Sequence, residues 1–176
     1  MLLSPFKLER YFARYEFNTE FLLCSSDCES ISIADLLALE EGSAERFQNQ
    51  WLGYTESLGS PTLRKEIAGM YTTTQPEDVL IFTGANEAIY LFMMAALKSD
   101  DHVIVHAPHY QALSEVAKGI GCDISLWYAR EENGWALDLD ELTRLLRPAT
   151  KAIIVNLPHN PTGYLMPRAD FDALNH

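Results

Sequence analysis

Residues 156–163 read Asn-Leu-Pro-His-Asn-Pro-Thr-Gly, and they directly follow residues 151–155, a largely apolar run typical of a buried strand. Pro158 and Pro161 stiffen the turn, because each fixes its own φ angle and biases the preceding residue towards an extended conformation. Asn160 is therefore expected at the carboxyl end of a strand, where ligand sites of open α/β sheets lie. Its amide suits recognition of a polar substituent on a small ring. A bare Asn-Pro pair would indicate only a turn, so the interpretation depends on the full string.

Short apolar runs alternate with helical patterns through the rest of the chain after residue 50. The alternation predicts helices that begin near residues 61, 85, 110 and 138, and strands at residues 79–83, 102–106, 122–127 and 151–155. Pro61 suits a first helical position, and Asp138 with Glu141 forms a capping-box pattern. We therefore predict an α/β fold in three layers, with a mostly parallel sheet flanked by helices.

Residues 1–50 show no such alternation. An amphipathic helix is expected within residues 8–17, and a second at residues 33–39 with Ser32 as its N-cap. We interpret residues 1–50 as an amino-terminal arm or part of a small domain, and residues 51–176 as an incomplete large domain.

The composition excludes several classes of function. A net charge of −12 argues against nucleic acid and anionic membrane surfaces as partners. No stretch reaches the roughly 18 apolar residues that span a bilayer, and the amino terminus lacks a signal-peptide pattern. Cys24, Cys28 and Cys122 have neither zinc-site nor Cys-x-x-Cys spacing. Reduced thiols in a cytoplasmic protein are the simplest interpretation.

The joint between the predicted strand at 79–83 and the next helix is a candidate phosphate site. Gly84 allows a tight turn and close approach of a ligand, and the N–H groups of Ala85 and Asn86 would point out of the helix start towards an anion. An ordinary turn that needs glycine only for its geometry remains open. No Gly-x-Gly-x-x-Gly or Walker-type string is present, which argues against dinucleotides and nucleoside triphosphates.

Tyr110 follows the predicted strand at 102–106 and could stack on a flat ring. Packing on the next helix is the alternative role. Gly84, Tyr110 and Asn160 all follow carboxyl ends of predicted parallel strands, so we expect them at one edge of the sheet. Together they suit a phosphorylated aromatic ring that bears a hydroxyl, a description that pyridoxal 5′-phosphate meets.

The motifs resemble those of the amino-terminal half of fold-type I, pyridoxal-phosphate-dependent aminotransferases of class I/II. Residues 53–64 resemble the family's Tyr…Gly…Leu-Arg segment, and residues 84–88 its phosphate loop. Residues 108–110 resemble its ring-stacking position, and residues 156–163 match its Asn-x-Pro-x-Asn-Pro-Thr-Gly signature at every position. The resemblance covers about residues 50–168.

The resemblance implies a role for each motif. Gly84, Ala85 and Asn86 would hold the cofactor phosphate, Tyr110 would stack on the pyridine ring and Asn160 would bond its hydroxyl. Tyr54 would reach the cofactor of a neighbouring subunit in a homodimer, unless it is a core tyrosine beside Trp51. The substrates would be an amino acid and a keto acid. Residues 22–30 depart from the family's glycine-containing substrate segment and faintly resemble amino-acid cyclising synthases, so lyase, decarboxylase and cyclising chemistry stay open.

The catalytic residues of the family are expected to be missing. Its Schiff-base lysine lies beyond the signature, and none of the five lysines of this chain (Lys7, Lys65, Lys98, Lys118 and Lys151) matches that motif. We therefore assign no catalytic residue and expect a truncated, inactive front half. A non-catalytic remnant or interaction module is the alternative. His102, His106 and His109 could suggest a metal site, but structural roles are favoured.

Overall fold

The computed structural model describes residues 3–175, which form two compact units. One unit contains residues 3–26 and 84–175, and the other contains residues 27–83. This division differs from the boundary expected near residue 50, because the first 24 described residues group with the part of the chain that carries the sheet. The assignment of an arm and an incomplete large domain stays a prediction.

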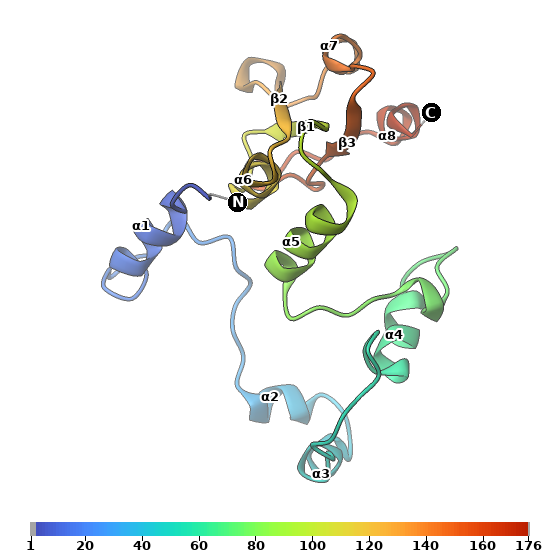
Figure 1. Ribbon diagram of the computed structural model, residues 1–176. Coiled ribbons are helices and arrows are strands. Elements are labelled where there is room, and N and C mark those ends of the chain that lie inside the picture. Colours follow the sequence, from blue (N-terminus) through green and yellow to red (C-terminus); the bar gives the residue numbers. More distant parts are fainter. Residues whose placement is uncertain (1–2, 176) are drawn as a thin grey trace. The chain divides into compact units, whose positions relative to one another are not determined.

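A parallel sheet of three strands forms the centre of the first unit (Figure 1). The strands are β1 (His102–Ala107), β2 (Asp123–Tyr128) and β3 (Thr150–Ile154), in the order β2-β1-β3. β1 pairs in register with β2 from His102↔Asp123 to Ala107↔Tyr128, and it also pairs with β3. Every residue of β1 is buried. The parallel sheet and three of the four expected strands are thus confirmed.

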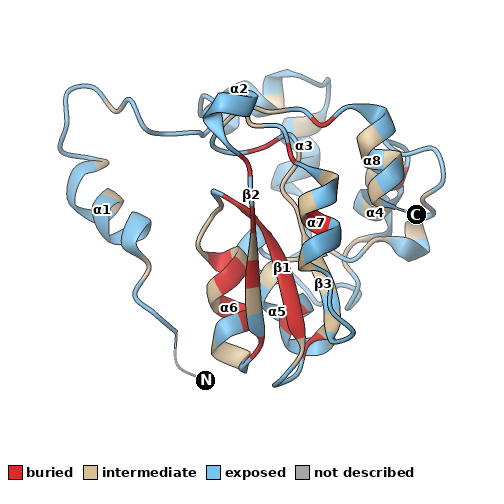
Figure 2. Ribbon diagram, turned by 90° about the horizontal axis from the view of Figure 1, so that it is seen from above, coloured by how far each residue is buried: buried red, intermediate tan, exposed pale blue. Residues whose placement is uncertain are grey.

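Helices cover both faces of this sheet, which gives the three expected layers (Figure 2). Val103 and Val105 of β1 pack against α5 (Ala85–Ala96) and α6 (Ala112–Ile120) on one face. Ile104 points to the other face and packs with Trp127 and with Leu142 of α7 (Leu139–Leu145). The alternation follows from the two-residue period of a strand. Leu174 of α8 (Arg168–Leu174) packs at the edge of this second core.

The ends of the helices follow local chemistry. α6 ends at Gly121, which has a φ of 109° in the left-handed region that favours glycine. The Asp138 carboxylate accepts a hydrogen bond from the backbone N–H of Asp140 at 2.8 Å and so caps α7. A short 3-10 helix, η2 (Glu131–Asn133), precedes α7. The expected starts of α5 and α7 are confirmed, whereas α8 was not expected from the sequence.

The second unit contains helices and no strand among its described residues. Its elements are α2 (Ile33–Ala38), α3 (Ser43–Gln48), α4 (Pro61–Ala68) and the 3-10 helix η1 (Pro76–Asp78). The Ser32 hydroxyl accepts a hydrogen bond from the backbone N–H of Asp35 at 3.1 Å, which confirms it as the N-cap of α2. Pro61 occupies the first position of α4, as expected.

The prediction of a strand at residues 79–83 was wrong. A strand needs a neighbour along its length, and this segment pairs with no strand in the described part of the chain. Its Ile81 N–H instead donates to the carbonyl oxygen of Leu58 at 3.0 Å. Leu80 is 47% exposed, so the apolar run is not covered as a central strand would be.

The amino-terminal helix α1 (Lys7–Tyr15) confirms the expected amphipathic helix. It is joined to the start of α6 by Gln111, whose side chain accepts from the backbone N–H of Lys7 at 3.0 Å and donates to the carbonyl oxygen of Pro5 at 3.1 Å. Tyr11 on α1 remains 49% exposed.

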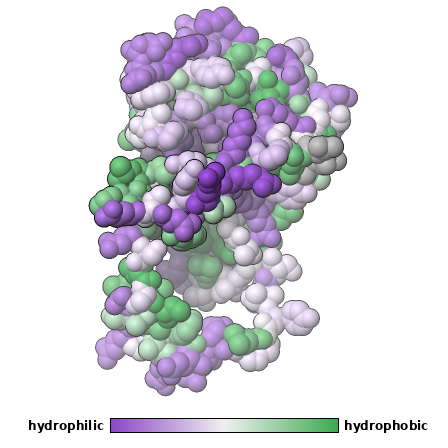
Figure 3. Space-filling model, turned by 90° about the vertical axis from the view of Figure 1, so that its left-hand side faces the viewer, coloured by the Kyte–Doolittle hydropathy of each residue, from purple (hydrophilic) through white to green (hydrophobic). Residues whose placement is uncertain are grey.

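Figure 3 shows hydrophobic side chains interspersed with hydrophilic ones on the face that it draws. Within residues 3–175, no helix is both long and apolar enough to cross a membrane.

Candidate functional site

The start of α5 has the geometry of an anion site. Gly84 is its N-cap, with a φ of 94° and a ψ of 162°, a combination that is essentially restricted to glycine. The first intrahelical bond runs from the N–H of Ala88 to the carbonyl oxygen of Gly84 at 3.4 Å. The N–H groups of Ala85 and Asn86 therefore have no acceptor within the helix. Apart from Gly84 and the adjoining backbone, no atom lies within 4 Å of the position that a Cβ on Gly84 would occupy, so a ligand can approach the backbone there.

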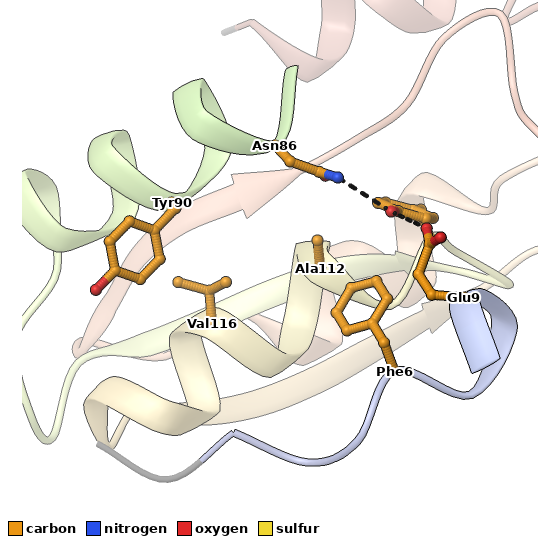
Figure 4. A pocket seen from close by; sticks show the side chains of 7 residues that line it. Phe6, Glu9, Asn86, Tyr90, Ala112 and Val116 are labelled. Carbon is orange, nitrogen blue, oxygen red and sulfur yellow. Dashed lines mark hydrogen bonds between the residues drawn. The ribbon is translucent and has the colours of Figure 1, made fainter. Parts of the chain in front are cut away.

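Tyr110 lies beside this helix start, in the loop after β1. Its phenol oxygen accepts a hydrogen bond from Nδ2 of Asn86 at 3.2 Å and donates to Oε1 of Glu9 at 2.9 Å (Figure 4). Burial, and then the Glu9 carboxylate, raise the pKa of the Tyr110 phenol, which keeps it a neutral donor. The ring of Phe6 packs edge-on against Tyr110 with centroids 5.5 Å apart.

A pocket of about 300 Å³ adjoins these side chains (Figure 4). It lies between α5 and α6 and is closed on one side by the amino-terminal segment. Its lining is mostly aromatic or aliphatic, and Glu9 and Asn86 contribute a carboxylate and an amide. The remaining lining residues are Phe6, Tyr90, Tyr110, Ala112 and Val116. Phe6 and Glu9 could not be predicted from the sequence, because a contact across 101 residues, as between Glu9 and Tyr110, leaves no local pattern.

Asn160 follows β3, as the sequence predicted. Its backbone N–H donates to Oδ1 of Asn156 at 2.9 Å, which closes the turn. Its side-chain Nδ2 donates to the hydroxyl of Ser26 at 3.2 Å. Ser26 is thus a site residue that the sequence did not indicate, although it lies within residues 22–30, where the chain departs from the motif pattern.

A histidine joins the Asn160 turn to the loop that carries Tyr110. One ring nitrogen of His159, Nε2, lies 2.7 Å from the carbonyl oxygen of Pro108. The contacts Asn86–Tyr110 and Pro108–His159 therefore connect the three predicted loops at the carboxyl edge of the sheet. A phosphate-sized anion at the helix start, a flat ring against Tyr110 and a ring substituent near Asn160 are compatible with this arrangement.

The family is decided by comparison with known proteins. Residues 22–176 match the family model "Aminotransferase class I and II". This chain belongs to the class I and II aminotransferases. Membership implies pyridoxal 5′-phosphate as the cofactor, and the α/β fold agrees with that of solved members.

Individual relatives match almost the whole length of this chain. Capreomycidine synthase of Streptomyces vinaceus is 32% identical over 158 residues, which are 89% of this chain and 41% of that protein. A PLP-dependent aminotransferase from Streptococcus suis 89-1591 has a TM-score of 0.91 and 33% identity, over 99% of this chain and 48% of that one. The PLP-dependent cyclase OrfR has a TM-score of 0.88 and 28% identity, over 99% and 46%. The chain thus spans less than half the length of these relatives.

Tyr54 lies in the other unit, which contains residues 27–83. Its side chain is fully exposed and that of Trp51 is 75% exposed. The alternative of a core tyrosine packed beside Trp51 is therefore wrong. A role towards the cofactor of a neighbouring subunit stays a prediction.

The histidines have structural partners. The ring of His102 lies 2.7 Å from the Thr150 hydroxyl and 2.9 Å from that of Ser125. His106 stacks on His159, and burial together with the neighbouring His159 and His109 lowers its pKa to about 4. Burial, followed by the positive charge of Lys118, also lowers the pKa of His109. Among residues 3–175, no three side chains of the metal-binding types are grouped to hold an ion.

Proposed function

We propose that this chain forms the cofactor-binding portion of a pyridoxal-phosphate-dependent aminotransferase. The observation that carries the proposal is the meeting of three loops at one sheet edge, through the Asn86–Tyr110 contact of 3.2 Å and the Pro108–His159 contact of 2.7 Å. Family membership supports the same assignment. The substrates would be an amino acid and a keto acid.

Each loop would hold one part of the cofactor. The N–H groups at Gly84, Ala85 and Asn86 would donate to the phosphate, aided by the dipole of the 12-residue α5. The ring of Tyr110 would stack on the pyridine ring. Nδ2 of Asn160 has two hydrogens, so it could donate to the ring hydroxyl while it keeps its bond to Ser26. When bound, the cofactor supplies an electron sink for the reaction at the substrate's α-carbon.

The amine that bonds this cofactor would come from outside the chain. None of the five lysines lies in the three loops, which are residues 84–86, 107–110 and 156–163. The chain spans less than half of its relatives. We propose that the lysine belongs to the part of the family fold that this chain does not span, and that the chain alone does not transaminate.

A cyclising reaction is the second candidate. Its support is that a synthase and a cyclase match 89% and 99% of the chain, including the amino-terminal 22–30 segment. Ser26, which lies within that segment, bonds Asn160. Amino-acid cyclisation and transamination would use the same cofactor loops, so the two candidates differ in substrate handling and not in the site described here.

We further propose a homodimer in the cytoplasm. Fully exposed Tyr54 supports the first proposal, since its expected partner lies in a second subunit. The three free cysteines support the second.

The proposal is tested by adding pyridoxal 5′-phosphate to the purified chain, reducing the mixture with borohydride and measuring the intact mass. We expect saturable binding, followed by a mass without a covalent pyridoxyl group and no turnover with an amino donor. An adduct on any of the five lysines, together with turnover, would contradict the proposed division of the site. Pyridoxal carrying no phosphate is the matched control, and we expect it to bind more weakly because it cannot use the start of α5.

A further inference from the structure

His159 makes an unusually complete set of contacts for a residue in a turn. Its side chain is buried, with 2% of the residue exposed. Nδ1 lies 2.7 Å from the hydroxyl of Thr162, and Nε2 lies 2.7 Å from the carbonyl oxygen of Pro108. The backbone N–H of His159 donates to Tyr164 at 2.8 Å, and its carbonyl accepts from Gly163 at 2.7 Å. Both the ring and the main chain are therefore fixed.

The partners decide where the proton of the neutral imidazole lies. A carbonyl oxygen only accepts, so Nε2 must carry the hydrogen that is donated to Pro108. Nδ1 then accepts from the Thr162 hydroxyl. The oxygen of that hydroxyl in turn accepts from the N–H of Tyr164 at 3.3 Å. One tautomer thus satisfies every polar atom of this group.

The ring also rests on a second imidazole. His106 of β1 stacks on His159 with centroids 3.8 Å apart and an interplanar angle of 25°. His106 is 1% exposed, and neither of its ring nitrogens has a hydrogen-bond partner among the described residues. The contact between these rings is therefore one of packing, and it holds His159 above the end of the central strand.

We propose that His159 is a positioning residue, which fixes the distance between Tyr110 and Asn160 through its bond to Pro108. Tyr110 lies two residues after Pro108, and Asn160 directly follows His159. A cofactor ring must contact the Tyr110 ring and the Asn160 amide at once, so drift between the loops would weaken both contacts together. The inference deepens the proposed function and rests on it.

Two variants distinguish the contact of the His159 ring with Pro108 from its contact with Thr162. In His159→Gln, the side-chain amide can place its nitrogen near Nε2 and still donate to Pro108. In His159→Asn, the shorter side chain can keep the contact with Thr162 but cannot reach Pro108. His102→Asn is the matched control, because His102 is also buried on two hydroxyl partners but lies at the opposite end of β1.

Cofactor affinity is compared with affinity for inorganic phosphate, which needs only the start of α5. We expect His159→Asn to weaken pyridoxal phosphate binding by about tenfold, the worth of one lost hydrogen bond, and to leave phosphate binding unchanged. His159→Gln should recover most of the loss. His102→Asn should lower the melting temperature without changing the ratio of the two affinities. Equal losses for both ligands in His159→Asn, or equal cofactor affinity in His159→Asn and the wild type, would overturn the inference.

A cofactor-free measurement keeps the inference testable if a variant fails to fold. Nitrogen NMR of the wild-type imidazoles should show His159 as the Nε2–H tautomer. The backbone amides of Tyr110 and Asn160 should both exchange their hydrogens slowly with solvent. The Nδ1–H tautomer would overturn the inference even if the cofactor binds. Failure of the wild type to bind the cofactor, with the expected tautomer present, would contradict the proposed function and with it the positioning role.

Discussion

The side-chain amide of Asn86, at the start of α5, donates a hydrogen bond to the phenol oxygen of Tyr110 at 3.2 Å. Asn86 belongs to α5 and Tyr110 to the loop after β1, so the bond joins the start of a helix to an aromatic ring of another segment. The Tyr110 hydroxyl continues the chain of bonds to Glu9. The ring and the hydroxyl of Tyr110 therefore have separable roles, which substitution can distinguish.

Substitution of Tyr110 should separate stacking from hydrogen bonding. Tyr110→Ala removes the ring, and we expect cofactor affinity to fall by about 3- to 10-fold, the range that offset stacking supplies. Tyr110→Phe keeps the ring and loses only exposed hydrogen bonds, so its affinity should stay within about threefold of the wild type. Titration followed by cofactor fluorescence measures both. Tyr71→Ala, at a 62% exposed tyrosine of the other unit, is the control. Equal losses in the Phe and Ala variants would show that the ring does not stack.

Substitution of Gly84 should affect both stability and phosphate binding. Its backbone conformation, with φ 94° and ψ 162°, costs other residues roughly 1–3 kcal/mol, while a Cβ there would meet no atom within 4 Å. Gly84→Ala should therefore lower the free energy of unfolding and weaken phosphate binding. Gly134→Ala is the matched control, since Gly134 also has a positive φ, of 60°, and open space around it. Gly134→Ala should lower the free energy of unfolding and leave phosphate binding unchanged. Unchanged phosphate affinity in Gly84→Ala would argue against an anion site at α5.

Stability should fall as the pH drops from about 6.5 to about 4. Burial, His159 and His109 lower the pKa of His106 from 6.5 to about 4. The unfolded chain therefore binds a proton in this window that the folded chain does not, and unfolding becomes easier by up to about 3 kcal/mol. Above pH 6.5 His106 is neutral in both the folded and the unfolded chain, so none of this free energy of unfolding is lost.

Urea denaturation at pH 7, 5.5 and 4.5 measures this effect. His106→Phe keeps a ring against His159 but cannot take up a proton, so its stability should depend less steeply on pH than that of the wild type. Carboxyl groups titrate in both proteins and cancel in the difference. Identical pH profiles would show that His106 is readily protonated in the folded chain.

The alternation of apolar runs and helical patterns was enough to predict the parallel sheet and its helical layers. These features depend on local periodicity, as in the fully buried β1 and in α7 behind its Asp138 cap. The prediction of a strand at residues 79–83 was wrong because a strand depends on more than local periodicity. Its apolar residues fit a strand, but pairing depends on a neighbour that no local pattern reports.

Prediction of the candidate site from the sequence was limited in the same way. Gly84, Tyr110 and Asn160 were found because each follows an apolar run with its own turn chemistry. Ser26 and Glu9 contact Asn160 and Tyr110 across 134 and 101 residues. Contacts at such separations are set by tertiary packing, so no local pattern in the sequence predicts them. His159 was visible within the signature, but only its bond to Pro108 indicates a role.

Exposed apolar side chains on α5 should cause the chain to associate. Phe92 is 64% exposed and adjoins an apolar pocket beside β3, lined in part by Ile153 and Ile154. Burial of such a ring contributes about 1.5–3 kcal/mol, so Phe92→Ser should weaken self-association by roughly tenfold or more. Sedimentation velocity measures this. Phe47→Ser, at a 57% exposed position of α3, should have a smaller effect. A wild-type chain that stays monomeric at all concentrations would contradict the prediction.

The central claim is that the loops of Gly84, Tyr110 and Asn160 jointly hold one phosphorylated pyridine. Calorimetric titration of pyridoxal 5′-phosphate into the wild type and into Gly84→Ala, Tyr110→Ala and Asn160→Ala tests it most directly. The account predicts one saturable site in the wild type and an affinity loss of about 3- to 10-fold in each variant. Absence of saturable binding in the wild type, or equal affinity in all four proteins, would contradict it.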